Sequence, residues 1–236
     1  MGIGDIRYTV LQTVNEVQRK LGLTATAALA TNSLSIQLVD FVNDVCNELS
    51  DFGNWQEMLV SANVTAVAGQ QDYTISTSAN IKNIGDIYFI NSGSRSGPLS
   101  HITLEDMRLL TRSSAQGLPR QFTTFGTDAN GNPNLRMHPI PTSSEHGGLF
   151  SVLRWDRTPH YTTGSGALVI PFPARVVVLG VLAKQILNES GGAPSPRYQQ
   201  TYQDYLTARK EALNRFIGDT GWEIAFRPST GNRRRR

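Results

Sequence analysis

The side chains best suited to binding chemistry stand at the C-terminal end of the sequence. Guanidinium groups gather there, and each can hold a carboxylate or a phosphate at two points. Three large apolar residues precede them at every second position, the spacing at which an extended strand places side chains on one side. We therefore predict that residues 222–236 form an extended basic tail that docks into a neighbouring protein; the alternative is a solvated tail. The predicted binding residues are Trp222, Ile224, Phe226, Arg227, Arg233, Arg234, Arg235 and Arg236.

The basic balance of the chain comes from this tail. Lysine and arginine number 22, and aspartate and glutamate 19, which gives a net charge of +3. Arg227 and Arg233–Arg236 supply five of the 22 basic residues, so the rest of the chain holds 17 basic against 19 acidic side chains. A nearly neutral body disfavours a nucleic-acid-binding fold. The arginines could still contact phosphates, so a nucleic-acid-binding protein anchored by its tail is the alternative function.

Residues typical of catalysis are scattered along the chain. The four histidines have no neighbour at a metal-ligand spacing; they are His101, His138, His146 and His160. Gly164-Ser165-Gly166 lacks the Lys and Ser/Thr that complete a phosphate-binding loop, and no Gly-x-Ser-x-Gly elbow is present. Cys46 falls on the apolar face of an expected helix, which predicts a buried, inert thiol.

One polar stretch, 128–132, resembles the start of a calcium-binding loop. Asp128, Asn130 and Asn132 have the required spacing, but Pro133 and Pro139 occupy the positions that need glycine and glutamate. A hairpin turn is the better interpretation. We expect no catalytic residues, no metal and no cofactor, and a protein that is not an enzyme. A hydrolase using Asp128, His138 or His160 is a third, weaker hypothesis.

The length and composition are those of a folded protein with a core of its own. The chain has 236 residues, 39% of them hydrophobic and 17% charged. No apolar run approaches the roughly 18 residues of a membrane-spanning helix, so no membrane association is expected. The start of the chain lacks the pattern of a signal peptide. The single cysteine excludes an internal disulfide.

Apolar periodicity predicts helices at both ends and strands between them. Helical spacing covers residues 3–21, 35–52, 171–190 and 196–217, and Thr103 caps a short helix in the middle. Alternating apolar residues cut by Gly, Pro and Asn predict several antiparallel strands, the last at 167–170. We predict an α+β protein with a helical bundle built from N- and C-terminal helices, an inserted antiparallel β-sandwich or barrel-like domain, and an extended C-terminal tail. The expected parts are residues 1–55, 56–170, 171–221 and the tail 222–236.

Five short motifs, in order, carry a resemblance to a known family. They are Thr65–Ile75, Pro98–Ile102, Gly117-Leu118-Pro119, Leu135–Pro141 and Ile170-Pro171, followed by two helices. Together, over about residues 39–217, they resemble the head-to-tail adaptor proteins of tailed bacteriophages, of the tail-tubular-protein-A type of podophages. Two departures concern the subtype: Ile75-Ser76 and Arg154-Trp155 stand where that family often has Leu-Pro and Tyr.

The resemblance implies a structural role in the virion. Such adaptors form a ring of twelve copies below the portal, around the DNA exit channel, with helices side by side and the β-domain facing the tail nozzle or tail tube. The family's C-terminal segment commonly inserts between portal subunits, and Trp222–Arg236 stands at that position. The protein would be made in the host cytoplasm and could contact channel DNA without reading its sequence.

Overall fold

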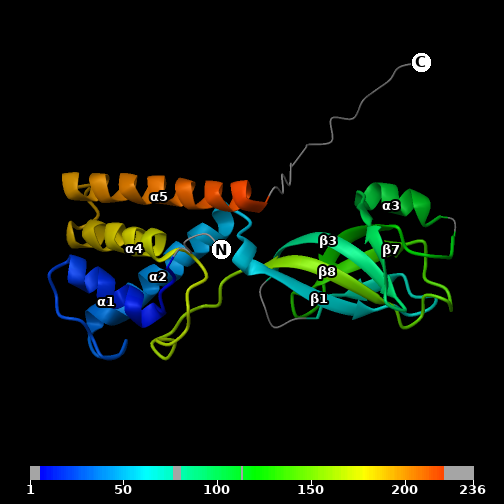
Figure 1. Ribbon diagram of the computed structural model, residues 1–236, viewed down its shortest axis with the longest axis horizontal. Coiled ribbons are helices and arrows are strands. Elements are labelled where there is room, and N and C mark those ends of the chain that lie inside the picture. The colour runs from blue at the N-terminus through cyan, green and yellow to red at the C-terminus, as the bar shows by residue number, and fades with distance from the viewer. Residues whose placement is uncertain (1–5, 77–80, 113, 221–236) are drawn as a thin grey trace, which may run out of the picture. The chain divides into compact units, whose positions relative to one another are not determined.

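The computed structural model describes residues 6–76, 81–112 and 114–220, and these form an α+β structure (Figure 1). The helices are α1 (Val10–Lys20), α2 (Ser33–Phe52), α3 (Leu104–Leu110), α4 (Ala174–Glu189) and α5 (Pro196–Thr220), with a short 3-10 turn at Gln56–Met58. The strands are β1 (Leu59–Thr65), β2 (Asp72–Thr74), β3 (Ile81–Asn91), β4 (Ser94–Pro98), β5 (Ser100–His101), β6 (Gln121–Thr127), β7 (Pro133–His138) and β8 (Leu149–Asp156). The expected α+β class is confirmed.

The chain divides into two compact units. The helical unit holds the described residues up to Val45 and those from Thr162 onward, and the β unit is Cys46–Tyr161. Helices from the two ends of the chain therefore share one unit, into which the β unit is inserted. The four-part division predicted from the sequence stays a prediction.

The first helix begins later than its apolar spacing predicts. The Thr9 side chain accepts the Gln12 N–H, and the Gln12 side chain accepts the Thr9 N–H, so a capping box starts α1 at Val10. The carbonyl groups of Ile6 and Tyr8 accept hydrogen bonds from the backbone N–H groups of Ala174 and Ile170, at 2.9 and 3.0 Å. The prediction of a sheet strand at 167–170 is therefore wrong, because these residues pair with the segment before α1.

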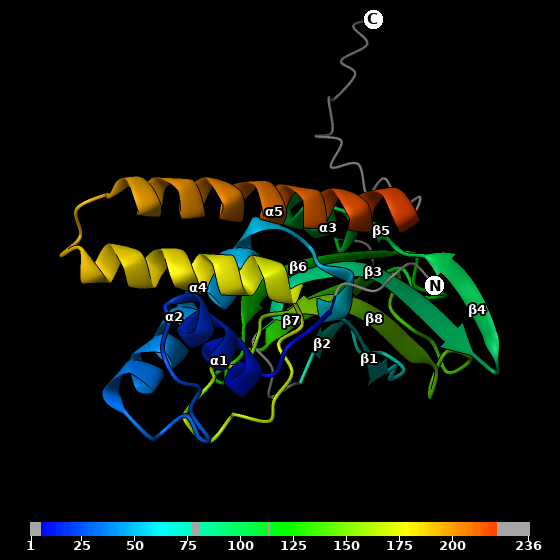
Figure 2. The same ribbon diagram turned by 60° about the vertical axis from the view of Figure 1, so that its left-hand side comes forward.

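Helix α4 is the most deeply buried helix of the helical unit. Its own buried side chains lie on nearly every face of the helix and are mostly apolar. The helix packs against α1 and α5 (Figures 1 and 2). Helix α5 starts as expected, with Ser195 Oγ accepting the Tyr198 N–H at 3.1 Å and Pro196 in the first turn. Its buried side includes Tyr205, Ala208 and Ala212.

The β unit contains two four-stranded sheets. One has the order β1-β8-β3-β4 and is antiparallel throughout; the other has the order β2-β7-β6-β5. The expectation of purely antiparallel pairing is wrong for the second sheet, because β5 pairs with β6 in parallel. Helix α3 lies between them in the chain and acts as the crossover that parallel neighbours require. The two sheets remain separate, so the barrel-like alternative does not hold.

Both sheets contribute to a single apolar core. Alternate residues of β3, β7 and β8 point into it, as their more and less buried positions show, and β6 contributes Phe122. Tyr73 meets Phe150 edge-on, and Phe150 also lies against Phe89, with ring centroids 5.0 and 5.2 Å apart. The core residues are Ala66, Tyr73, Ile75, Ile87, Phe89, Leu99, Phe122, Leu135, Met137, Phe150 and Val152.

Candidate interaction surfaces

The predicted docking residues at the C-terminal end, Trp222, Ile224, Phe226, Arg227 and Arg233–Arg236, lie outside the described residues. The extended tail is therefore still a prediction from sequence. The surfaces that can be built from structure are those of the two units.

The four histidines occupy separate environments. His101 is exposed beside the Phe122 ring, at a centroid distance of 5.0 Å, and His160 is also exposed. His138 is buried at the end of β7, and His146 Nδ1 accepts the Ala68 backbone N–H at 3.3 Å. Among the described residues, no three His, Cys, Asp or Glu side chains group into a metal site.

The stretch 128–132 is the turn of the β6–β7 hairpin, as predicted. The Asp128 carboxylate accepts the backbone N–H groups of Asn130 and Asn132, both at 2.8 Å, and the Asn132 side-chain amide at 2.9 Å. These bonds, foremost that from the Asn132 side chain, hold the pKa of Asp128 below its ordinary value. Gly131 supplies the positive φ, +81°, that the turn needs. The carboxylate thus serves the turn.

Two further sequence candidates have local structural roles. Cys46 is 1% exposed, and burial raises the pKa of its thiol, so the group stays protonated and unreactive at neutral pH. Ser165 Oγ accepts the Thr162 N–H at 3.0 Å, and Gly166 O accepts the Leu11 N–H at 3.1 Å. The Gly-Ser-Gly stretch is therefore a turn that pairs with the start of α1.

Three loops of the β unit meet at one end of its strands, away from Leu59 and Asp156. We call residues 66–71, 91–94 and 139–148 the distal loops. Gly69 N donates to Pro141 O at 2.8 Å, and Asn91 Nδ2 donates to Ser144 O at 2.9 Å. With the Ala68–His146 bond, these contacts fix each loop to another. The distal loops therefore present a defined surface.

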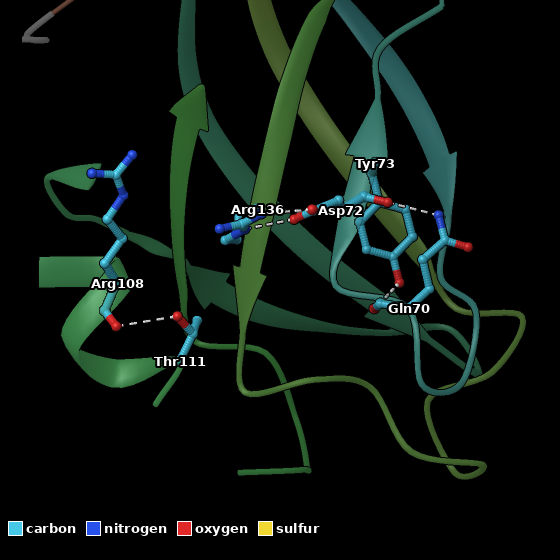
Figure 3. Close-up of polar contacts among 6 residues, drawn as sticks. All are labelled: Gln70, Asp72, Tyr73, Arg108, Thr111 and Arg136. Atoms are coloured by element: carbon cyan, nitrogen blue, oxygen red, sulfur yellow. Dashed lines mark hydrogen bonds and ion pairs between the residues drawn. The ribbon is translucent and has the colours of Figure 1, made fainter. Parts of the chain in front are cut away.

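Tyr73 anchors the first distal loop from inside the core. Its hydroxyl donates to Gln70 O at 2.9 Å and accepts the Val67 N–H at 3.2 Å, while its ring stays 4% exposed (Figure 3). In the third loop, Glu145 accepts the Thr142 N–H at 2.8 Å, and the bonds from Thr142 lower the pKa of the Glu145 carboxyl. Both loops are thus held by side chains as well as by backbone.

The outer face of the second sheet carries a cross-strand ion pair. Arg136 on β7 holds both oxygens of Asp72 on β2, through Nε and Nη2, each at 2.7 Å (Figure 3). Its guanidinium also lies 4.7 Å from the centre of the Phe125 ring. The bond to Asp72 raises the pKa of Arg136. Farther along this face, α3 packs on β6. At the end of this helix the Thr111 hydroxyl donates a hydrogen bond to the Arg108 backbone carbonyl at 3.3 Å (Figure 3).

The four sheet edges of the β unit differ in length and regularity. Strand β1 has seven residues in unbroken register with β8, from Leu59 opposite Trp155 to Thr65 opposite Leu149. Strand β4 forms the other edge of that sheet (Figure 2). Its register with β3 is interrupted between Tyr88 and Ile90. In the second sheet, β2 has three residues and β5 has two.

Sequence reasoning missed the Asp72–Arg136 pair and the edge position of β1. Asp72 and Arg136 stand 64 positions apart, so only the register of β2 with β7 brings them together. Alternation predicts strands between the helical ends of the chain, but it says nothing about sheet order. The sequence of β1, Leu-Val-Ser-Ala-Asn-Val-Thr, contains no charged residue and no proline, which are the residues that block pairing at a sheet edge. This was the available signal that β1, if placed at an edge, would be unprotected.

Comparison with known families gives one match over nearly the whole chain. A family model described as SU10 adaptor protein matches residues 8–229. No curated protein matches the chain. Within the described residues, no helix combines the length and the apolar character needed to cross a bilayer.

Proposed function

Because the chain belongs to the SU10 adaptor protein family, a family of bacteriophage adaptors, we propose that it joins the portal to the tail. The match over residues 8–229 carries this proposal, since it covers both units. The protein would be a component of the virion at the head–tail interface, made in the host cytoplasm. Its role there would be structural, without catalysis, metal or cofactor.

In the proposed arrangement, about twelve copies form a ring around the DNA exit channel. The helices of the helical unit would pack as a bundle and lie side by side with those of the next copy. A heterologous contact between neighbours closes such a ring, and it needs only complementary faces. The finer subtype, that of the tail-tubular-protein-A adaptors of podophages, is part of the same proposal.

The β unit would face the tail nozzle or tail tube. The hydrogen bonds among the distal loops favour this role, because a surface that is already ordered loses little conformational entropy when a partner binds. Asp128, which could have held a cation, already accepts hydrogen bonds from its own turn.

The C-terminal residues would dock into the portal. In this proposal Trp222, Ile224 and Phe226 enter an apolar groove, and Arg227 and Arg233–Arg236 pair with portal carboxylates. The same arginines favour the alternative function, non-specific nucleic-acid binding. In that case affinity would fall steeply with added salt and would be lost without residues 227–236.

The test is the native mass of the full chain and of a version ending at Gly221, each alone and mixed with the portal. The proposal expects a ring only when the full chain meets the portal. A full chain that ignores the portal and binds DNA in a salt-dependent way would favour the nucleic-acid function instead. Assembly by the shortened chain would contradict the docking role of the tail.

A further inference from the structure

Strand β1 has the features of an unprotected sheet edge. It is seven residues long, it has no bulge against β8, and it contains no charged residue and no proline. Leu59 and Val60 are 37% and 38% exposed, and Ser61, Asn63 and Thr65 are exposed as well. Such an edge is a template for pairing with a further strand.

The other three edges carry the devices that block pairing. Strand β4 is bulged, contains Arg95 over the Tyr88 ring at 3.6 Å, and ends at Pro98, which has no N–H to donate. Strands β2 and β5, with three residues and two, are too short to support a stable pair. Within the described part of the β unit, only the edge at β1 lacks such protection.

The backbone of β1 shows which groups point away from β8. Ala66 N donates to Gly148 O at 2.8 Å, and Ala66 O accepts from Gly147 N at 2.9 Å, so both groups of Ala66 face the β8 side. Because strand geometry repeats every two residues, the same holds for Val64, Ala62 and Val60. Ser61, Asn63 and Thr65 therefore turn their N–H and C=O groups toward the open edge.

We propose that β1 pairs with β1 of a second copy, antiparallel, about a two-fold axis at Ala62. This register overlaps all seven residues and places residues with outward N–H groups opposite one another: Ser61 against Asn63, and Leu59 against Thr65. On the core-facing side Val60 meets Val64, and Ala62 meets its own copy. Ala62 and Val64 already pack against the core, so the new neighbour extends an apolar face.

A second copy is the favoured partner for the β1 edge because this pairing stops at two copies. The joined sheet would be bounded at both ends by β4, the edge with a bulge, Arg95 and Pro98. No further copy can then add, so the product is a closed dimer. The inference goes beyond the proposed function, whose ring uses heterologous faces. It concerns the free protein before it meets the portal.

The first experiment measures the mass of the free full chain by sedimentation over a range of concentrations, without the portal. The wild type is expected to dimerise. The double variant S61K/N63K puts like charges opposite one another twice, which should weaken the dimer roughly tenfold or more. S61E/N63E should do the same, and an equimolar mixture of the two variants should restore dimers. Ser94→Lys on β4 is the matched control and should leave the mass unchanged.

The second experiment tests the register. Ala62→Cys should form an intermolecular disulfide on mild oxidation, because residues opposite each other in a non-hydrogen-bonded pair have Cα atoms about 4.5 Å apart. Val60→Cys, which meets Val64, should not. Cys46 is buried and does not interfere. A wild type that is monomeric at every concentration, or equal cross-linking at positions 60 and 62, would overturn the proposal. Binding of a strand from another protein to monomeric β1 would overturn it too.

Discussion

Gly180 allows three helices of the helical unit to approach one another, so Gly180→Ala should destabilise this unit. A Cβ atom at this position would lie 2.9 and 3.0 Å from the Val45 methyl carbons and 3.0 Å from Tyr205 Cε2. These side chains come from α2 and α5, while Gly180 is on α4. Val45 is 0% exposed and Tyr205 1% exposed, so neither can swing into solvent.

Two opposing effects decide the size of the change. Alanine favours a helix over glycine by up to about 1 kcal/mol. Forcing an extra carbon into a packed core costs about 1–3 kcal/mol. The overpacking should exceed the helical gain, and we expect a net loss of about 1 kcal/mol, or a fall of roughly 2–4 °C in the unfolding midpoint.

Thermal unfolding followed by far-ultraviolet circular dichroism measures this loss. Val45→Ala provides the matched test, since it removes the methyl groups nearest the new carbon. In a double-mutant cycle, Gly180→Ala should cost less in the Val45→Ala background, or become stabilising. A rise in the midpoint for Gly180→Ala in the wild-type background would mean that helix propensity prevails, and the close-packing argument would be refuted.

Three other predictions concern the β unit and the tail. Gly148→Ala should cost about 1–3 kcal/mol in denaturant unfolding, because its Cβ would lie 2.5 Å from the buried Phe89 ring. Gly97→Ala, with open space, should stay near neutral. The depressed pKa of Asp128 means that its contribution is complete above the ordinary value of 3.8 and disappears as pH falls through the lower folded value. The protection of the turn amides, measured as their exchange rate relative to the intrinsic rate at the same pH, should therefore fall at acid pH, and protection that does not change with pH would refute this. Phe226→Ala should weaken portal co-sedimentation more than Arg235→Ala, since a buried aromatic anchor contributes more than an exposed charge; the reverse order would contradict docking by apolar anchors.

Local signals in the sequence were sufficient to predict most of the elements. Thr103 before Leu104 and the turn at 128–132 have the roles expected of them, and the helix expected over residues 196–217 begins at Pro196. The start of α1 was misjudged because Ile6 continues the helical spacing, whereas its backbone pairs with residues near Ala174. Apolar periodicity cannot distinguish a helical turn from a short extended segment that meets a distant partner.

Long-range pairing was beyond sequence reasoning. The parallel contact of β5 with β6, and the edge positions of β1 and β2, depend on strand order, which alternation does not encode. The same limit applies to the candidate surfaces: turns were predicted, but not that the distal loops bond to one another. The predicted docking residues at the C-terminal end could be chosen from composition and spacing alone, and their role remains a prediction.

The insertion of the β unit has a consequence for synthesis on the ribosome. Helices α1 and α2 leave the exit tunnel well before α4, because residues 53–173 are translated between the end of α2 and the start of α4. At roughly 5–20 residues per second, this interval is on the order of ten seconds. Val10, Val14 and Val17, which are fully buried in the finished protein, spend that time without α4. The β unit draws all its strand pairs from its own residues, so it can fold in the interval. The β unit can thus fold before the helical unit is complete, and a chaperone that binds apolar helices would act on α1 and α2.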